Sequence, residues 1–253
     1  MNTIEKKEGN PLLSIYFTAG YPALDSTIQI AKKLEEAGAD FLEIGFPYSD
    51  PVADGPVIQH SSEVALANGM TVKKLFEQLR ELRQHVQIPV FLMGYVNPVI
   101  QFGVEKFCEE CKNVGVDGVI IPDLPMYEYE DLYRETFEKN GIANIFIVTP
   151  QTSTELIRKI DSLSNSFIYL LSSNATTGKT LDVGEDTNAY FKRIHDLQLK
   201  NPLIVGFGIS DKGTFQKASQ YTAGAIIGSA FVKRLGEQDY IAQITDFIKS
   251  IKG

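Results

Sequence analysis

Three carboxylates stand close together along one stretch of the chain. Glu43 lies inside the apolar run FLEIG, and Asp50 and Asp54 follow in the loop YSDPVADGP, which prolines and Gly55 stiffen and bend. An unpaired carboxyl group in an apolar strand is costly to ionise, so its pKa is expected to rise. Such a group suits general acid and base work near neutral pH, and we predict that role for Glu43. Asp50 taken alone fits a turn or a helix cap equally well.

A second group of residues has the chemistry of a phosphate site. Small residues follow two later apolar runs, and the last of them opens the short helical piece SAFVKRL: Gly206, Gly208, Gly228 and Ser229. Unobstructed backbone N–H groups at such a position bind dianions. These glycines also fit ordinary tight turns, but their paired placement favours phosphate binding. The loop SSNATTGKT, with Thr177 and Gly178, offers donors from a third side and has the composition of a closing lid.

Other common chemistries lack their residues. No lysine ends an apolar run, which argues against a Schiff-base aldolase. His60, His85 and His195 are scattered along the chain, so we expect no metal site. Cys108 and Cys111 form a C-x-x-C pair within a helical pattern, without a second pair or a nearby histidine. We interpret them as packing residues.

Eight short apolar runs are the elements that must position these residues. Each reads as a continuously buried strand, and segments of helical periodicity separate them, which is typical of a parallel sheet covered by helices. Glycine stands at four helix-to-strand joints, where it is expected to cap the preceding helix: Gly38, Gly115, Gly141 and Gly224. The predicted strands span residues 12–19, 41–45, 88–95, 118–123, 143–149, 166–172, 202–207 and 224–228.

This alternation predicts an α/β fold, a (β/α)₈ TIM barrel that forms a single domain over residues 1–253, with a short polar segment at 1–10. The competing fold is a doubly wound open sheet. That fold would place a glycine-rich fingerprint after its first strand, where this chain reads TAGYPALD. In a barrel the active site gathers at the carboxyl ends of the strands, which is where Glu43 and the glycine pairs fall.

Charge and hydropathy narrow the possible partners. The chain of 253 residues holds 24 basic and 32 acidic residues, a net charge of −8. Such a surface repels nucleic acid and anionic membranes, so a small-molecule substrate or a protein partner is expected. No apolar run approaches the ~20 residues of a membrane helix, and the N-terminus MNTIEKKEGN is polar. We therefore expect a cytoplasmic enzyme.

Several spaced motifs together resemble one family. LEIGFPYSDPVADGPVIQ, YFTAGYP, GYVNPVIQFG, VIIPDLP, GFGIS and IIGSAF occur in the order found in the tryptophan synthase alpha subunit. The resemblance implies a retro-aldol cleavage of indole-3-glycerol phosphate to indole and glyceraldehyde 3-phosphate, with no cofactor on this subunit. It also implies a PLP-dependent beta subunit, which receives indole through a tunnel in an α₂β₂ complex.

The same resemblance implies roles for individual residues. Glu43 would move the protons at indole C3 and at the glycerol hydroxyl, Asp54 would face the indole N–H, and Asp50 would communicate with the beta subunit. The positions that match the family's indole pocket are Tyr16, Ile58, Tyr95, Asp123, Tyr169 and Phe207. Those that match its phosphate site are Thr177, Gly178, Gly208, Gly228 and Ser229. Asn97 and Pro98 match a loop that faces the partner.

One departure from the family and two rival functions remain open at this point. Many family members carry Arg after the sixth strand, where this chain has Ser173, so weaker ordering of the lid in the isolated subunit is a hypothesis. A non-catalytic barrel that only regulates a partner is one rival, although it would not need both Glu43 and Asp54. Another phosphate-binding barrel, such as an isomerase, is the second.

Overall fold

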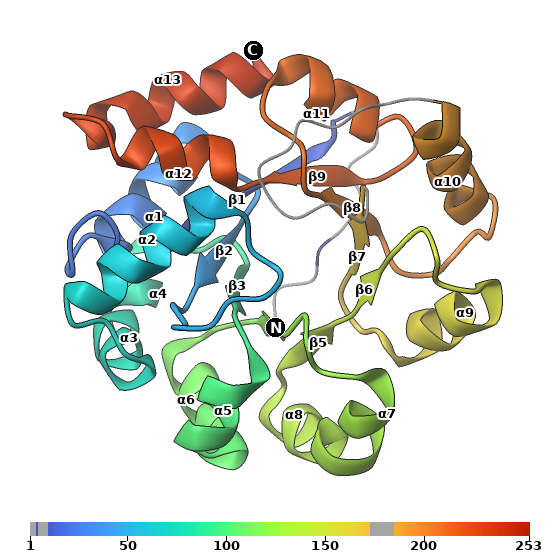
Figure 1. The fold of residues 1–253 in the computed structure, drawn as a ribbon, viewed down its shortest axis with the longest axis horizontal. Coiled ribbons are helices and arrows are strands. Elements are labelled where there is room, and N and C mark those ends of the chain that lie inside the picture. The colour runs from blue at the N-terminus through green and yellow to red at the C-terminus, as the bar shows by residue number, and fades with distance from the viewer. Residues whose placement is uncertain (1–3, 5–9, 173–184) are drawn as a thin grey trace.

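A computed structural model describes residue 4, residues 10–172 and residues 185–253. In that part of the chain, nine parallel strands form one sheet in the order β5-β4-β3-β2-β1-β9-β8-β7-β6. The two outer strands of that order, β5 and β6, are consecutive along the chain and are separated only by Phe146, so the sheet closes on itself (Figure 1). The predicted TIM barrel is confirmed.

All eight predicted strands form at their predicted places, with one correction. The fifth stretch is not one strand, because β5 and β6 pair with different neighbours, β4 and β7. Between them the Phe146 carbonyl accepts a hydrogen bond from Tyr169 N–H at 3.0 Å. The strands are β1 Leu12–Thr18, β2 Phe41–Gly45, β3 Val90–Met93, β4 Gly118–Ile120, β5 Ala143–Ile145, β6 Ile147–Val148, β7 Ile168–Leu171, β8 Leu203–Gly206 and β9 Gly224–Ile227.

Helices surround the barrel in chain order (Figure 1). They are α1 Thr27–Ala37, α2 Pro56–Ala67, α3 Val72–Leu79, α4 Leu82–His85, α5 Val96–Phe102, α6 Val104–Val114, α7 Met126–Glu128, the π-helix η1 Tyr129–Tyr133, α8 Arg134–Asn140, α9 Thr154–Leu163, α10 Glu185–His195, α11 Lys212–Ala218, α12 Ser229–Leu235 and α13 Tyr240–Lys252. Cys108 and Cys111 lie in α6 and are free and fully buried, as packing residues are. Within the described residues, every helix is too short or too polar to cross a membrane.

Glycine plays two different parts at the joints between helices and strands. Gly38, Gly115 and Gly141 end their helices in the left-handed conformation, with φ of 103°, 78° and 70°, as predicted for helix caps. The capping interpretation of Gly224 is wrong. Gly224 is the first residue of β9 and pairs with Leu12 of β1, and a Cβ built on it would stand 2.0 Å from the Leu12 carbonyl oxygen. Close approach of two strands requires glycine there.

Three phenylalanines fill the inside of the barrel. The rings of Phe41, Phe91 and Phe167 are fully buried, with centroids 5.1 to 5.9 Å apart and two of the three contacts edge-on. Side chains two residues apart on a strand share one face. The next inward-facing positions toward the carboxyl ends are therefore Glu43 and Met93, and the phenylalanine layer is the floor beneath them.

The two roles of glycine predict different costs for adding one methyl group. Gly224→Ala drives a Cβ into the backbone of β1, so we expect it to lower the free energy of unfolding by about 3 kcal/mol or more. Gly141→Ala meets no atom within 4 Å and costs only left-handed strain, about 1 kcal/mol. Urea unfolding of both variants measures the difference. Equal losses would mean that Gly224 is merely another cap.

Candidate active site

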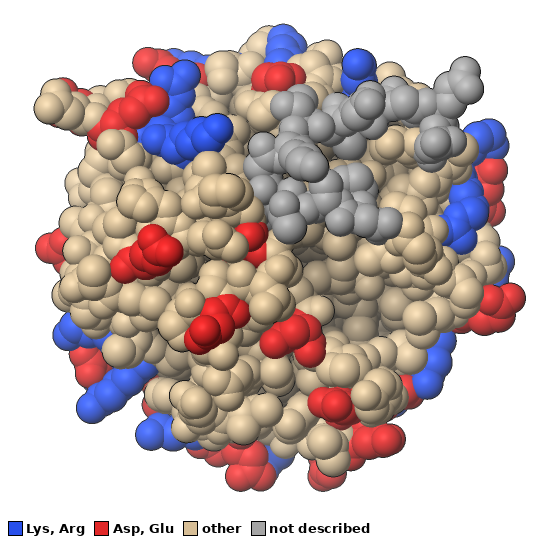
Figure 2. Space-filling model, in the orientation of Figure 1, with Lys and Arg blue, Asp and Glu red and all other residues tan. Residues whose placement is uncertain are grey.

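A cavity of about 140 Å³ opens at the carboxyl ends of the strands. In Figure 2 this face of the molecule is hollowed near its centre. Most of the residues predicted to contact a substrate line it together: Tyr16, Glu43, Asp54, Ile58, Tyr169, Phe207, Gly208, Gly228 and Ser229. Six lining residues that were not predicted from the sequence join them: Met93, Ile209, Ser210, Ile226, Ala230 and Lys233.

The Glu43 carboxyl group is the most unusual feature of this cavity. The residue is fully buried, and neither carboxyl oxygen has a hydrogen-bond partner among the described residues. Its strand neighbours in register, Tyr16 on β1 and Phe91 on β3, bring no positive charge. Because burial penalises the charged form, the pKa of Glu43 rises from its ordinary 4.5 to about 8. The group therefore carries a proton at neutral pH.

The Asp54 carboxyl group is held differently, by a loop rather than a strand. The Tyr95 hydroxyl donates a hydrogen bond to Asp54 Oδ2 at 3.1 Å and accepts one from Ala53 N–H at 2.9 Å. Gln59 Nε2 donates to the Asp54 carbonyl at 2.9 Å and ties the loop to α2. Burial raises the pKa of Asp54, while the Tyr95 hydrogen bond lowers it. Tyr95 thus favours the ionised form of Asp54 and fixes its position.

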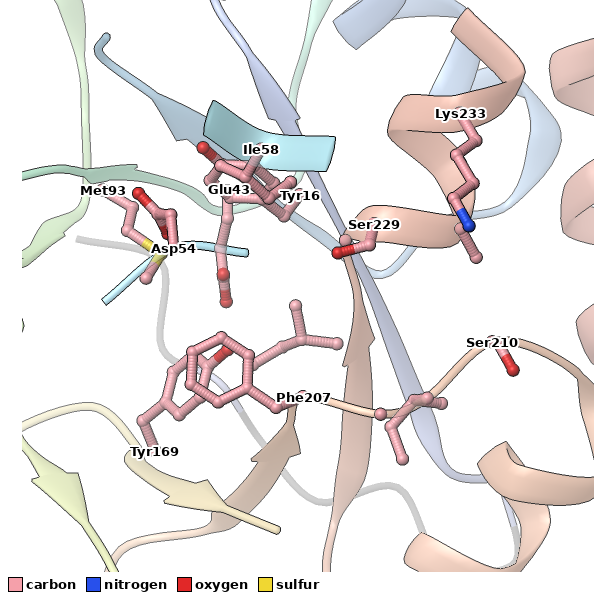
Figure 3. Close-up of a pocket in the computed structure, with 15 residues that line it drawn as sticks. Tyr16, Glu43, Asp54, Ile58, Met93, Tyr169, Phe207, Ser210, Ser229 and Lys233 are labelled. Atoms are coloured by element: carbon pink, nitrogen blue, oxygen red, sulfur yellow. The ribbon is translucent and has the colours of Figure 1, made fainter. Parts of the chain in front are cut away.

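Aromatic rings form the walls, and glycines on the adjacent strands make room for them. A Cβ on Gly45 would meet the Tyr16 hydroxyl at 2.2 Å, and a Cβ on Gly206 would meet the Tyr169 hydroxyl at 1.9 Å. Burial raises the pKa of both tyrosines, so their hydroxyls stay neutral. Figure 3 shows the rings of Tyr169 and Phe207 facing Glu43 across the cavity. A flat apolar group fits between such walls.

Phe207 reaches its place through an uncommon backbone conformation. Its φ is +66°, in the left-handed region that non-glycine residues seldom adopt, and Gly208 follows at +74°. The Ser172 hydroxyl donates to the Phe207 carbonyl at 2.7 Å, and Ser172 N–H donates to the Gly206 carbonyl at 3.2 Å. Non-glycine residues held in this way cluster at functional sites, where the surrounding structure fixes them.

The end of the cavity opposite Asp54 is rich in hydrogen-bond donors. Gly208 and Ser210 come from the loop after β8, whereas Gly228, Ser229 and Lys233 come from the loop after β9 and from α12. Figure 3 shows Ser210, Ser229 and Lys233 on one side and Asp54 on the other, with Glu43 between the aromatic walls. Lys233 lies within α12 rather than at a strand end, so its place in the cavity was not predicted from the sequence. One feature of the sequence could have indicated it: Lys233 follows Ser229 by four residues in SAFVKRL, which places both side chains on one face of a helix.

Several other predicted site residues lie outside this cavity. Tyr95 lines an adjoining cavity of about 260 Å³, which shares Tyr16, Asp54, Met93 and Phe207 with the first. Asp123 lines neither; its Oδ1 accepts a hydrogen bond from Val96 N–H at the start of α5. Thr177 and Gly178, with the departure at Ser173, fall outside the described residues.

The residues predicted to face a partner gather beside the Asp54 loop. Asp50 and Asn97 are exposed and Pro98 is half-buried. Asn97 Nδ2 donates a hydrogen bond to the Tyr48 hydroxyl at 3.1 Å, which joins the start of α5 to the loop that carries Asp50 and Asp54. The ring of Tyr48 also packs on Tyr95 with centroids 5.4 Å apart. A partner that binds this surface would therefore touch residues that contact Tyr95, the side chain that holds Asp54.

Known proteins with similar sequences and similar folds belong to the family that the sequence motifs resemble. The family model described as tryptophan synthase alpha chain matches residues 2–251. A tryptophan synthase alpha chain from Christiangramia forsetii is 57% identical over 254 residues, covering 100% of this chain and 99% of the relative. The structure of tryptophan synthase subunit alpha from Legionella pneumophila has a TM-score of 0.86 at 31% identity, covering 96% of this chain and 91% of that one. The aminoacrylate-bound form of tryptophan synthase from M. tuberculosis has a TM-score of 0.84 at 26% identity, covering 96% and 92%.

The raised pKa of Glu43 has a consequence for stability. Between about pH 4.5 and about pH 8 the folded chain keeps a proton that the unfolded chain has released, so stability falls as pH rises through this window. Glu43→Gln removes that loss. We expect similar free energies of unfolding below about pH 4.5, and a more stable variant above about pH 8 by on the order of a few kcal/mol. Urea unfolding across the window measures this, and a difference independent of pH would contradict the raised pKa.

Proposed function

The chain belongs to the tryptophan synthase alpha chain family, and from that membership we propose how its residues cleave indole-3-glycerol phosphate. The reaction is a carbon–carbon lyase step that yields indole and glyceraldehyde 3-phosphate. The observation that carries the assignment is Glu43, a protonated, unpartnered carboxyl group inside an aromatic-walled cavity. An acid with a pKa near 8 both donates and accepts a proton near neutral pH.

We assign both proton transfers to Glu43. The protonated carboxyl group gives its proton to indole C3, which leaves positive charge on the ring nitrogen. The resulting carboxylate takes the proton of the glycerol hydroxyl as that carbon becomes the aldehyde. The bond between C3 and the glycerol carbon breaks, and its electron pair neutralises the ring. One proton is gained and one is lost, so Glu43 ends the cycle in its starting state.

Asp54 stabilises the charge that appears between these two transfers. Its carboxylate accepts a hydrogen bond from the indole N–H and offsets the positive charge of the protonated ring. This requires an ionised Asp54, and the Tyr95 hydroxyl favours that form. The strand supplies a fixed acid, while the loop brings the second carboxylate to another side of the same ring. Tyr95 acts through Asp54 and is a positioning residue.

The remaining predicted contacts divide between the two ends of the substrate. The indole ring lies among Tyr16, Ile58, Tyr169 and Phe207, and the phosphate lies at Gly208, Gly228 and Ser229. Thr177 and Gly178 stay in the proposal as contacts from the lid. Asp123 is retained as a family-matched position, although its carboxylate binds the start of α5.

We also propose a partner, a domain organisation and a cellular location for the enzyme. The family's beta subunit receives the indole in an α₂β₂ complex, and we place its contact on Asp50, Asn97 and Pro98. Val52, 81% exposed, and Ile100, 50% exposed, offer apolar contacts beside them. We further propose a single domain across residues 1–253 and a cytoplasmic location for this biosynthetic enzyme.

The first experiment measures indole release from indole-3-glycerol phosphate, with and without a beta subunit. Wild-type release should rise when the partner is added. Glu43→Gln should lower kcat/KM by at least about 10²-fold, because a positioned acid–base group is removed. In the wild type, kcat/KM should fall as pH rises through about 8, where Glu43 loses its proton.

Two outcomes of this experiment separate the assignments. Glu43→Gln with undiminished cleavage would falsify the acid–base role. No indole from the wild type under either condition would remove the proposed reaction itself. A Glu43→Gln variant that still activates the beta subunit, although it cleaves no substrate, would show that the docking surface works without the chemistry.

The role of Tyr95 gives a separate prediction. Tyr95→Phe removes the hydroxyl that binds both Asp54 Oδ2 and Ala53 N–H. We expect kcat to fall by about tenfold, which corresponds to the loss of roughly one charged hydrogen bond, and the acidic limb of the rate profile to move to higher pH. Tyr190→Phe is the control, since it deletes a buried hydroxyl that donates to the Val148 carbonyl instead. Equal effects of the two changes would argue for a general loss of stability.

A further inference from the structure

We propose that the Lys233 ammonium group binds the phosphate end of the substrate and sets the preference of the enzyme for phosphorylated ligands. The inference rests on the proposed function and adds a specificity-determining residue to it. Lys233 belongs to no strand end and to none of the motifs that identify the family. We assign it the role of binding phosphate from three observations: its position in the cavity, the charges around it, and the absence of other partners for its ammonium group among the described residues.

The position of Lys233 follows from the geometry of α12. Lys233 comes four residues after Ser229, so the two side chains lie on one face of the helix. Side chains on a helix lean back toward its N-terminus, which carries the lysine stem over the turn that holds Ser229. Both residues line the active-site cavity, and Figure 3 shows the ammonium group on the side of Ser229 and Ser210.

The distribution of charge in the cavity leaves one place for a dianion. Among the described residues that line the cavity, Glu43 and Asp54 are the acids and Lys233 is the one cation. A phosphate group near Asp54 would meet a like charge in a partly desolvated setting, whereas near Lys233 it meets an opposite charge. The lysine therefore fixes the direction in which a phosphorylated substrate lies.

The donors of Lys233 are not engaged elsewhere in the described part of the chain. No hydrogen bond or ion pair of its ammonium group is found there, although other lysines pair with acids, as Lys74 does with Glu77 at 3.0 Å. The next residue, Arg234, pairs with Glu237 at 3.2 Å. Lys233 also borders the outer groove between α2 and α12 with Val57 and His60, so its stem lies at the rim of the cavity. An ammonium group there meets a phosphate without breaking an existing bond.

The expected effect is moderate because Lys233 is exposed to solvent. Charge-assisted hydrogen bonds to phosphate are stronger than neutral ones, but water and salt screen a group at the rim of a cavity. We therefore expect a loss of about tenfold in affinity for phosphorylated ligands when the charge is removed, and a smaller loss at high ionic strength.

The test compares the full-length wild-type chain with Lys233→Met, Lys233→Arg and Arg234→Met. Lys233→Met keeps most of the stem and removes the charge, and Arg234→Met makes the same change in charge on the outer side of the helix. The measurements are kcat and KM for indole-3-glycerol phosphate, and the dissociation constants of glycerol 3-phosphate and of indole by calorimetry. Indole lacks a phosphate group and reports on the rest of the cavity.

The expected result is specific to the phosphate. Lys233→Met should raise KM and the dissociation constant of glycerol 3-phosphate by about tenfold, with kcat changed by less than about twofold and indole binding unchanged. Lys233→Arg should recover most of the affinity, and Arg234→Met should behave as the wild type.

Three results would overturn the inference. They are unchanged binding of glycerol 3-phosphate by Lys233→Met, an equal loss in Arg234→Met, and a parallel loss of indole binding. A wild-type chain that releases no indole would remove the proposed function instead. Binding of glycerol 3-phosphate would then still decide the role of Lys233.

Discussion

Burial of the Glu43 carboxyl group without a partner is the constraint on which the rest of this structure depends. Moving an acid into an apolar interior costs free energy, and the same burial raises the pKa of Glu43 to about 8, in the range that the proposed proton transfers require. The layer of Phe41, Phe91 and Phe167 beneath it keeps that environment apolar. The rest of the barrel must therefore offset the free-energy cost of burying this carboxyl group, as is common at catalytic sites.

Space for the substrate comes from glycines as much as from the aromatic walls. Tyr16 lies over Gly45, Phe46 over Gly94 and Tyr169 over Gly206, and in each pair a side chain on the glycine would collide with the ring. The rings can approach the neighbouring backbone this closely only because glycine has no Cβ at these places. Ser172 then fixes the left-handed turn at Phe207, which places one more ring on the open side.

The two carboxyl groups of the cavity are held in different ways. Glu43 stands on a strand bonded on both sides, so its position is set by the barrel. Asp54 stands on a loop whose position depends on Tyr95, and Tyr95 packs on Tyr48 next to the surface assigned to the beta subunit. Asn97 on that surface and the Asp54 carboxylate are thus joined through Tyr48 and Tyr95, without a direct contact between the two ends.

The sequence by itself determined the barrel, because continuous apolar runs separated by helical periods have few other ways to bury their surface. It also identified Glu43 as a buried acid, since an acid in an apolar strand is conspicuous wherever that strand lies. Tertiary structure alone decided the rest. Gly224 proved to be a point of strand contact, the fifth strand divided at Phe146, and Asp123 turned to α5, because each outcome depends on a neighbour distant in the chain. Lys233 reaches the cavity from the second turn of a helix, and only the closure of the barrel brings that helix opposite Asp54.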